Sequence, residues 1–400
     1  MKILHFADLH IGYENYGHLD EKTGLNSRLL DFLKGFDQIV DYALKHQIEL
    51  IVFAGDAYKT RDPNPTCQRE FGKRVKKIAS QIPIVLITGN HDIPPSFGKA
   101  DTLEIFPTLE VPNVYVYSQP TQAIIKTKNG PVQILALPWL ARSRLLQEKE
   151  RRYPIEKVRD ILSQRLSEIF TKLLHQLKPN LPTIAVIHQS VTGASFASNQ
   201  TTYLGNDPLL PLSLLTNPTL NYVALGHLHK YQVLSEKPPV IYPGSIERID
   251  FGEEGETKGF VVAEIKPKKT DWEFIELPAR PFRTINIEIP PGTPSPSEYL
   301  KEKLSPVEIK GAIIRLIILG KEADLKQISG AELKKLLSEA AYVASIIKKS
   351  EKTIKKIEPA EPGLKPAEWL KRYLKLKNFD PKIREELIKE GLRLIEEVGL

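Results

Sequence analysis

LIVFAGD at residues 50–56 and IVLITGNHD at residues 84–92 share one plan, in which a short apolar run ends in a glycine and then in polar side chains. Such a run, rich in β-branched residues and bounded by a turn, is typical of a buried strand. The intervening segment at about 64–80 has the apolar spacing of a helix. Short apolar runs that lead into polar side chains recur in ILHFA (3–7), TIAVIH (183–188) and YVALGH (222–227), the last of them with a glycine. This alternation predicts a layered α/β domain.

Two regions of the first 280 residues contain strand patterns that follow one another without a helix between them. They lie at 111–138 and at 231–278. Directly consecutive strands argue against a purely parallel sheet. We therefore expect two packed sheets of mixed direction, with helices flanking them.

A change in residue pattern near residue 281 marks the expected end of this larger domain, which we assign to residues 1–280. Four prolines between residues 290 and 296 follow a strand-like segment. We expect a small α+β module over 281–352. Its predicted strands and helices are 282–289, 297–304, 311–319, 330–340 and 342–349, in alternating order beginning with a strand. Ser329 and Glu332 have capping-box spacing and are expected to start the second helix.

The tail, residues 353–400, is expected to contain a linker and two amphipathic helices. Apolar residues at helical spacing begin near residue 366, stop at Asn378-Phe379-Asp380-Pro381, and then resume. A helix pair with so little sequence of its own packs either on its own domain or on a partner protein. Periodicity alone leaves both destinations open.

The composition excludes some kinds of site but does not identify a function. The 400 residues carry a net charge of +7, which favours a polyanionic partner without establishing one. The single cysteine, Cys67, excludes an intramolecular disulfide and a cysteine-based metal cage, and we expect it to be a buried apolar residue. The opening MKILHFA has no features of an export signal, and no 18-residue apolar run follows. We expect a cytoplasmic protein that does not associate with membranes.

Five short polar motifs lie at the carboxyl ends of predicted strands, the edge where ligands bind in open α/β sheets. Taken singly, each motif is more often structural than metal-binding. Together they supply seven oxygen or nitrogen donors, which are Asp8, His10, Asp56, Asn90, His188, His227 and His229. This mixture suits divalent Mn, Fe or Zn. Seven donors favour two ions about 3.5–4 Å apart, with one carboxylate bridging them.

In this order, D-x-H, GD, GNHD, H and GHxH resemble the signature of the calcineurin-like metallophosphoesterases. Three longer segments, GDAYKTRDPNP (55–65), IHQSVTGA (187–194) and YPGSIERIDFGEEGE (242–256), are similar to the SbcD branch of double-strand-break-repair nucleases. The resemblance covers residues 1 to about 280 with strong motifs. It implies a four-layer α-β-β-α sandwich, with a cap module and a terminal helix pair after it.

The resemblance also implies a ligand set for two Mn²⁺ ions per chain, with Mg²⁺, Fe²⁺ or Zn²⁺ as possible substitutes. One ion would be held by Asp8, His10, Asp56 and His229. The other would be held by Asp56, Asn90, His188 and His227. Ligand types alone permit both Mn²⁺ and Zn²⁺.

Two further residues receive catalytic roles by resemblance. His91 matches a histidine that is not a ligand and faces the scissile phosphate, where it can stabilise the transition state or protonate the leaving oxygen. Asp92 matches a carboxylate expected to orient His91 by a hydrogen bond. The chain departs from the superfamily at Lys59, where an acidic residue or histidine is common. Lys59 and Arg61 are as consistent with phosphate contacts as with solvated surface charge.

The function implied is that of a DNA nuclease that processes DNA ends in repair and recombination. It comprises double-strand 3′ to 5′ exonuclease activity and single-strand and hairpin endonuclease activity. The implied partners are DNA, an SbcC-type ATPase docked on the terminal helices, and a second copy of the chain, joined through helices near 65–80 and 98–107 into a heterotetramer with the ATPase. Such a protein is expected to be nucleoid-associated. The alternative is a phosphoesterase acting on a small phosphodiester such as a cyclic nucleotide, which has little use for a basic cap and a terminal helix pair.

Overall fold

The structure is a computed structural model that describes residues 1–94, 99–195, 207–266, 269–350, 366–376 and 379–397. It contains a six-stranded sheet that includes the N-terminal strand. In spatial order its strands are β14 (Thr270–Glu276), β13 (Gly259–Ile265), β1 (Lys2–Phe6), β2 (Leu50–Phe53), β3 (Ile84–Ile87) and β4 (Val114–Tyr117). Strands β1 to β4 run parallel to one another. Strand β13 is antiparallel to β1, and β14 is antiparallel to β13. This first sheet is therefore mixed, as expected.

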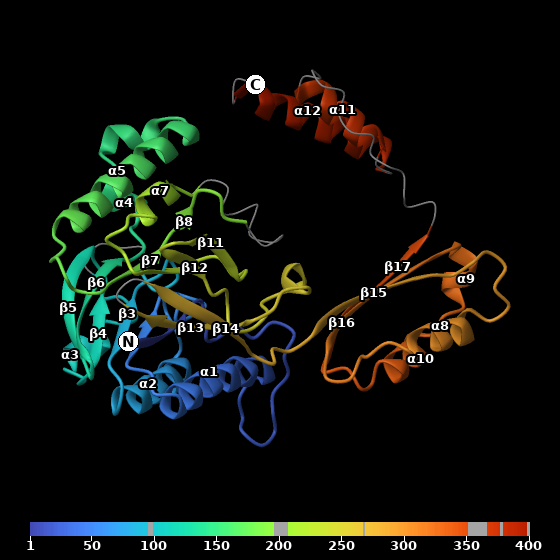
Figure 1. Cartoon of the computed structure of the whole chain (residues 1–400). Coiled ribbons are helices and arrows are strands. Elements are labelled where there is room, and N and C mark those ends of the chain that lie inside the picture. The colour runs from blue at the N-terminus through green and yellow to red at the C-terminus, as the bar shows by residue number, and fades with distance from the viewer. Residues whose placement is uncertain (95–98, 196–206, 267–268, 351–365, 377–378, 398–400) are drawn as a thin grey trace.

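A second six-stranded sheet faces the first (Figure 1). In spatial order its strands are β11 (Gln232–Glu236), β12 (Pro239–Tyr242), β10 (Tyr222–Gly226), β7 (Thr183–His188), β6 (Gly130–Leu137) and β5 (Thr121–Thr127). The four central strands run parallel, and the edge strands β5 and β11 are antiparallel to their neighbours. The parallel strands of both sheets need helical crossovers, which supply the outer layers.

Three long helices cover the outer faces of the two sheets. Helices α1 (Ser27–Lys45) and α2 (Pro65–Ala79) pack on the first sheet, and α5 (Ile155–His175) packs on the second. Asn26 and Asn64 cap α1 and α2 by accepting backbone N–H groups of the first turn. A third apolar cluster fills the space between the sheets. The result is the predicted α-β-β-α sandwich, and Cys67, in the first turn of α2, is buried as predicted.

Short elements lie in the connections. They are α3 (Ile105–Thr108), α4 (Arg142–Leu145), α7 (Leu212–Leu215), the 3₁₀ helices η1 (Glu148–Arg152) and η2 (Phe251–Glu253), and the pair β8 (Ser190–Val191) and β9 (Leu209–Leu210). Of these short elements, α3 overlaps the helix expected near 98–107, and the sequence analysis named none of the others. Among the described residues, no helix is both long and apolar enough to cross a bilayer.

Residues 282–350 form a separate three-stranded parallel sheet with its own apolar core. Its elements are β15 (Phe282–Glu288), α8 (Pro296–Leu304), β16 (Ile313–Gly320), α9 (Glu322–Lys326), α10 (Gly330–Leu336) and β17 (Tyr342–Ser350). Helix α10 starts after Ser329, as predicted, but the capping box is wrong. The Ser329 side chain makes no cap bond, and Glu332 accepts a hydrogen bond from Ser297 instead.

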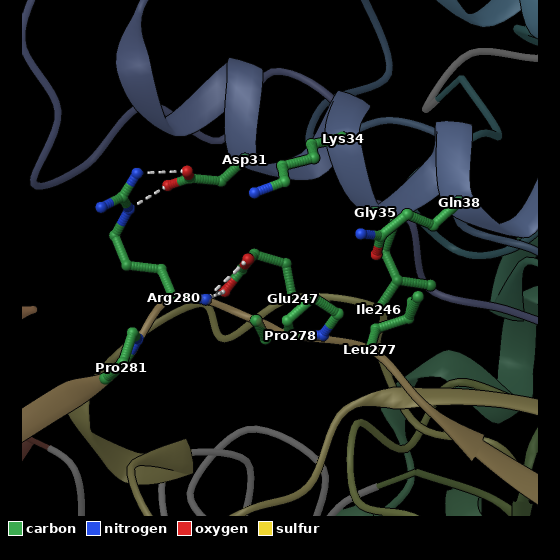
Figure 2. Close-up of a pocket in the computed structure, with 11 residues that line it drawn as sticks. Asp31, Lys34, Gly35, Gln38, Ile246, Glu247, Leu277, Pro278, Arg280 and Pro281 are labelled. Atoms are coloured by element: carbon green, nitrogen blue, oxygen red, sulfur yellow. Dashed lines mark hydrogen bonds and ion pairs between the residues drawn. The ribbon is translucent and has the colours of Figure 1, made fainter. Parts of the chain in front are cut away.

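Arg280 ties the chain entering this small sheet to the larger body (Figure 2). Its guanidinium donates two hydrogen bonds to Asp31 on α1 and a third to the carbonyl of Gly311, which precedes β16. Its backbone N–H donates to the carboxylate of Glu247. The junction thus combines charged hydrogen bonds with aromatic packing, in which Tyr16 and Phe251 of the larger body contact Phe282 of β15.

Two helices, α11 (Pro366–Leu376) and α12 (Pro381–Glu397), form the tail and pack against each other. Leu370 lies so close to Gly391 that any larger side chain there would collide with it. The predicted helix pair and the break between the helices are confirmed, whereas the expected linker at 353–365 lies outside the described residues.

Candidate metal centre

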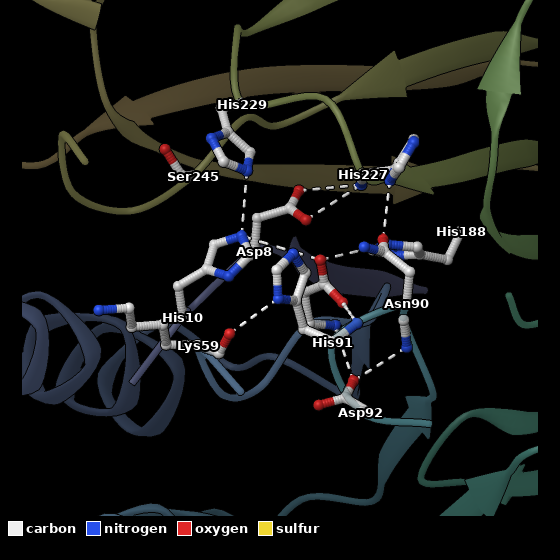
Figure 3. A network of polar contacts seen from close by, with 12 residues as sticks. Asp8, His10, Lys59, Asn90, His91, Asp92, His188, His227, His229 and Ser245 are labelled. Atoms are coloured by element: carbon white, nitrogen blue, oxygen red, sulfur yellow. Dashed lines mark hydrogen bonds and ion pairs between the residues drawn. The ribbon is translucent and has the colours of Figure 1, made fainter. Parts of the chain in front are cut away.

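The predicted donor residues all lie where strands of the two sheets end (Figure 3). Asp8 follows β1, Asp56 follows β2, Asn90 follows β3, His188 ends β7, and His227 follows β10. Carboxyl ends of parallel strands in two facing sheets therefore converge on one rim, as the sequence predicts. The ring and carboxylate atoms approach closely enough to share cations.

On one side of the rim, Asp8, His10 and His229 place potential ligand atoms within 4.8 Å of one another. The Nε2 atoms of His10 and His229 are 3.0 Å apart. Because Glu253 accepts from Nδ1 of His229 at 2.8 Å, that ring can direct the lone pair of Nε2 toward His10. Two imidazole nitrogens that face each other in a buried place are well suited to share a cation.

On the other side, the side-chain oxygen of Asn90 lies between two imidazoles. It is 3.2 Å from Nε2 of His188 and 3.0 Å from Nδ1 of His227. Asp56 joins the two sides, since its Oδ2 lies 3.8 Å from Nε2 of His10 and 3.5 Å from Nε2 of His188. That is the place expected of a bridging carboxylate.

The loops that carry these donors are held in a backbone conformation that L-residues rarely adopt. Asp8, His10, Asp56 and His227 have φ values of 53°, 45°, 60° and 100°. Left-handed backbone at non-glycine residues costs free energy and persists only where surrounding contacts hold it. Here the backbone N–H groups of Asp8 and His10 donate to the carbonyls of Gly55 and Asp56, and the Asp8 carboxylate accepts the N–H of His227.

A hydrogen-bond acceptor behind each of three histidines selects the ring nitrogen that faces the rim. The carbonyl of Ala54 accepts from Nδ1 of His188 at 2.6 Å. Asp207 contacts Nε2 of His227 at 3.0 Å, and Glu253 contacts Nδ1 of His229. Sequence reasoning missed all three acceptors. Glu253 stands in the quoted segment 242–256, whereas a backbone carbonyl leaves no signal in the sequence.

His91 is held differently from what the sequence predicts. Its Nδ1 lies 2.8 Å from the carbonyl oxygen of Lys59, and its ring packs edge-on against His10. Asp92 does not contact this ring, so the expected role of Asp92 in orienting it is wrong. The buried Asp92 carboxylate instead accepts backbone N–H groups of Asp56, Ala57 and Gly89, together with the Thr102 hydroxyl. Asp92 therefore fixes the loops that carry Asp56 and Asn90.

Burial and mutual charge decide the protonation of the cluster. Burial raises the pKa of Asp8. Burial also opposes ionisation of Asp56, but the imidazoles of His188 and His91 hold its pKa well below the usual value. Burial likewise opposes a charge on His188, yet Asp56 raises the pKa of that imidazole to about 9. Positive charge beside Asp56 is thus favourable, and divalent cations bound among these residues would provide it.

Fold and donor set together define a metallophosphoesterase, an enzyme that hydrolyses phosphate esters with divalent metal ions. The chain belongs to the family described as calcineurin-like phosphoesterase, whose family model matches residues 1–231. The predicted resemblance to this superfamily is confirmed.

The chain is also similar, at modest sequence identity, to individual proteins. The chain is 25% identical over 281 residues to the SbcD subunit of the SbcCD nuclease of Bacillus subtilis, covering 69% of this chain and 70% of the relative. It is 23% identical over 372 residues to the DNA double-strand break repair protein Mre11 of Archaeoglobus fulgidus, covering 84% and 72%. Among solved structures, a dimetal phosphatase from Danio rerio matches 68% of this chain and 95% of its own, with 11% identity and a TM-score of 0.40.

Proposed function

We propose that this protein is a Mn²⁺-dependent DNA nuclease of the SbcD type, which processes DNA ends as a subunit of an ATP-regulated complex. The observation that carries the proposal is the convergence of seven donor side chains from five separate segments, with Asp56 between the two groups. The names of the two relatives, a nuclease and a DNA repair protein, support DNA as the substrate. We assign the activity as double-strand 3′ to 5′ exonuclease and single-strand or hairpin endonuclease.

The proposed ligands of one Mn²⁺ are Asp8, His10, Asp56 and His229, and those of the other are Asp56, Asn90, His188 and His227. The bound cations would neutralise the phosphodiester oxygens and lower the pKa of a bound water. This chemistry suits DNA, because its anionic backbone otherwise repels an attacking nucleophile.

His91 is the proposed catalytic residue that does not bind metal. Its Nδ1 is engaged by the Lys59 carbonyl, so Nε2 is the nitrogen that can act on a phosphate oxygen or a leaving oxygen. Within the described part of the chain, no hydrogen bond is recorded for that Nε2. The Lys59 ammonium lies 4.5 Å from the centre of the Tyr13 ring, beside the same loop.

The regions outside the sandwich have proposed roles of their own. We assign residues 281–352 as a module that caps bound DNA and 353–400 as the segment that docks an SbcC-type ATPase. The docking proposal is supported by apolar side chains that stay exposed on the helix pair, namely Tyr373, Ile383, Leu387 and Leu394. Burial of such side chains by a partner helix is a common mode of recognition.

A homodimer is proposed through α2 and α3. Ile105 on α3 and Leu109 beside it are neighbouring large apolar side chains that are 51% and 66% exposed. They line a cavity of about 660 Å³ that also touches α2. Burial of this area by a second copy would remove apolar surface from water.

The decisive experiment is a cleavage assay on end-labelled hairpin DNA with Mn²⁺, with and without an SbcC-type ATPase partner. We expect hairpin opening and 3′ to 5′ degradation with Mn²⁺, and neither product with a chelator. A chromogenic phosphodiester assayed with unlabelled duplex DNA as competitor separates DNA from small substrates. Turnover of the chromogenic substrate that duplex DNA does not inhibit, together with intact hairpins, would contradict the proposal.

A further inference from the structure

Glu253 is a fully buried carboxylate whose oxygens face two different partners. One oxygen lies 2.8 Å from Nδ1 of His229. The other lies 2.8 Å from the ammonium of Lys258 and accepts the backbone N–H of Ile249 at 3.1 Å. Glu253 ends the short helix η2, whose first turn is capped by the side chain of Asp250. The carboxylate is therefore fixed on a rigid turn before it reaches the imidazole.

Lys258 holds the same histidine from the opposite end. Its ammonium, which is inaccessible to solvent, donates to the backbone carbonyl of His229 at 3.0 Å. It also donates to Ser245 at 2.9 Å and to Glu256 at 2.8 Å. Glu253 thus contacts the imidazole of His229, Lys258 binds its backbone carbonyl, and the two residues are joined to each other.

A buried ion pair of this kind needs an explanation other than stability. Removing two charges from water costs several kcal/mol per ion, and well-packed apolar residues often do as well or better. What the pair provides here is a fixed ring orientation and a defined tautomer. With a carboxylate at Nδ1, the Nδ1 atom keeps its proton and Nε2 presents a lone pair toward the rim.

The neighbouring histidine of the same GHLH motif is held in the opposite sense. Asp207 contacts Nε2 of His227, so Nδ1 is the nitrogen that faces Asn90. Two histidines separated by one residue thus turn different nitrogens to the rim. Each is selected by its own carboxylate.

We propose that Glu253, anchored by Lys258, is a positioning residue that fixes His229 as a metal donor through Nε2, and that Asp207 fixes His227 as a donor through Nδ1. The proposal rests on the proposed dinuclear centre. It assigns each carboxylate to one cation site. Glu253 serves the site of Asp8 and His10, and Asp207 serves the site of Asn90 and His188.

The test measures Mn²⁺ binding to the full-length chain by chelator competition and by electron paramagnetic resonance, without an activity readout. We expect E253Q to weaken one of two Mn²⁺ sites by about 10- to 100-fold and to leave the other near wild type. D207N is expected to weaken the other site by a similar factor. The double variant is expected to weaken both.

E256Q is the matched control, because it removes a carboxylate from the same Lys258 ammonium without touching His229. Wild-type binding in E256Q is the expected result. Equal losses in E253Q and E256Q would assign the effect to the buried lysine and overturn the proposal. Unchanged binding in E253Q would overturn it as well.

Two further outcomes are distinguished by design. If wild-type protein binds no Mn²⁺, the proposed function fails before the positioning roles are tested, whereas a wild type with two sites isolates the effect of the variants. If E253Q does not fold, as judged by circular dichroism, the double variant E253Q/K258M also removes the buried ammonium that has lost one of its two carboxylate partners, and carries the same measurement. Normal binding at both sites in that variant would contradict the role of Glu253.

Discussion

The two sheets contribute different side chains to the candidate metal centre. The first sheet supplies both carboxylates and the amide, on loops where Asp8 and Asp56 have left-handed backbone. The second sheet supplies imidazoles, and His188 is still part of regular strand β7. Neither sheet has a complete ligand set. The site therefore depends on the register of one sheet against the other, and the contacts that set this register matter as much as the donors.

Besides the apolar cluster between the sheets, close polar and backbone contacts join them. The Ala54 carbonyl, at the end of β2, accepts from His188 of the second sheet. A Cβ atom added to Gly226 in β10 would lie 2.0 Å from the same oxygen. Farther into the sandwich, His5 of β1 contacts the Tyr222 hydroxyl and the Leu225 carbonyl of β10. Variants that remove a donor from one sheet, or a contact between the sheets, test whether the site needs both sheets.

The largest effect is expected from D56N, which removes charge from the one donor near both halves of the centre. Loss of a bridging carboxylate should weaken both cation sites and lower cleavage by several orders of magnitude. Elemental analysis and Mn²⁺-dependent cleavage of labelled DNA measure the two effects. D62N, an exposed change on the following loop, is the control and should behave like wild type. Normal metal content in D56N would mean that the two sheets do not share a bridging donor.

H91A should separate chemistry from metal binding. His91 is oriented by a main-chain carbonyl and is absent from the proposed ligand set, so both metals should remain bound. Cleavage should fall by about 10²- to 10⁴-fold, the usual contribution of a general acid or base. Metal content and single-turnover cleavage are measured on the same preparation. Joint loss of metals and cleavage would show that His91 is a metal ligand. The first sheet, which carries His91, would then supply one more ligand than proposed.

G226A tests how closely the sheets must approach. A methyl group there cannot coexist with the Ala54 carbonyl, so the strands must move apart at the end that carries His188 and His227. We expect a loss of about 1–3 kcal/mol in the free energy of unfolding, measured by denaturant titration, and weaker Mn²⁺ binding. G330A at the first residue of α10, where an added Cβ atom meets nothing within 4 Å, is the control and should be neutral or slightly stabilising. Equal stabilities of the two variants would contradict the role given to this contact.

The sequence predicts the donors of both sheets better than the parts that hold them. Asp8, Asp56, Asn90 and His188 were found because each follows an apolar run, and such runs mark buried parallel strands. The Lys59 carbonyl that orients His91 could not be found, since every residue has a carbonyl and only the loop conformation aims it.

The carboxylates behind the histidines were missed for a related reason. Asp207 lies 20 residues from His227 and Glu253 lies 24 residues from His229, and both pairings depend on how loops fold back over the rim. Asp92 was predicted to orient His91, but its carboxylate contacts other groups. Its four donors come from two connections, the one after β2 and the one after β3, which only the folded chain brings together. Short-range pattern thus encodes strands and donors, while the supporting hydrogen bonds depend on tertiary structure.

The smallest effect concerns the polar link between the sheets and appears as a dependence of stability on pH. Burial lowers the pKa of His5 to about 3, although the Leu225 carbonyl acts in the opposite direction. The folded protein therefore keeps this ring neutral while the unfolded chain protonates it below its ordinary pKa of 6.5. The unfolded state binds more protons between these two values, so the free energy of unfolding falls as pH falls through this window.

The slope from His5 approaches about 1.4 kcal/mol per pH unit within the window. H5Q keeps a donor and an acceptor between Tyr222 and Leu225 but cannot titrate. We expect H5Q to be about 1 kcal/mol less stable than wild type at pH 7.5, the usual cost of an imperfect hydrogen bond, and to lose this deficit as the pH approaches 5. Denaturant unfolding with a chelator present, at several pH values, measures the difference and excludes metal binding as its cause. A deficit that stays constant with pH would show that His5 links the two sheets without its protonation contributing to their stability.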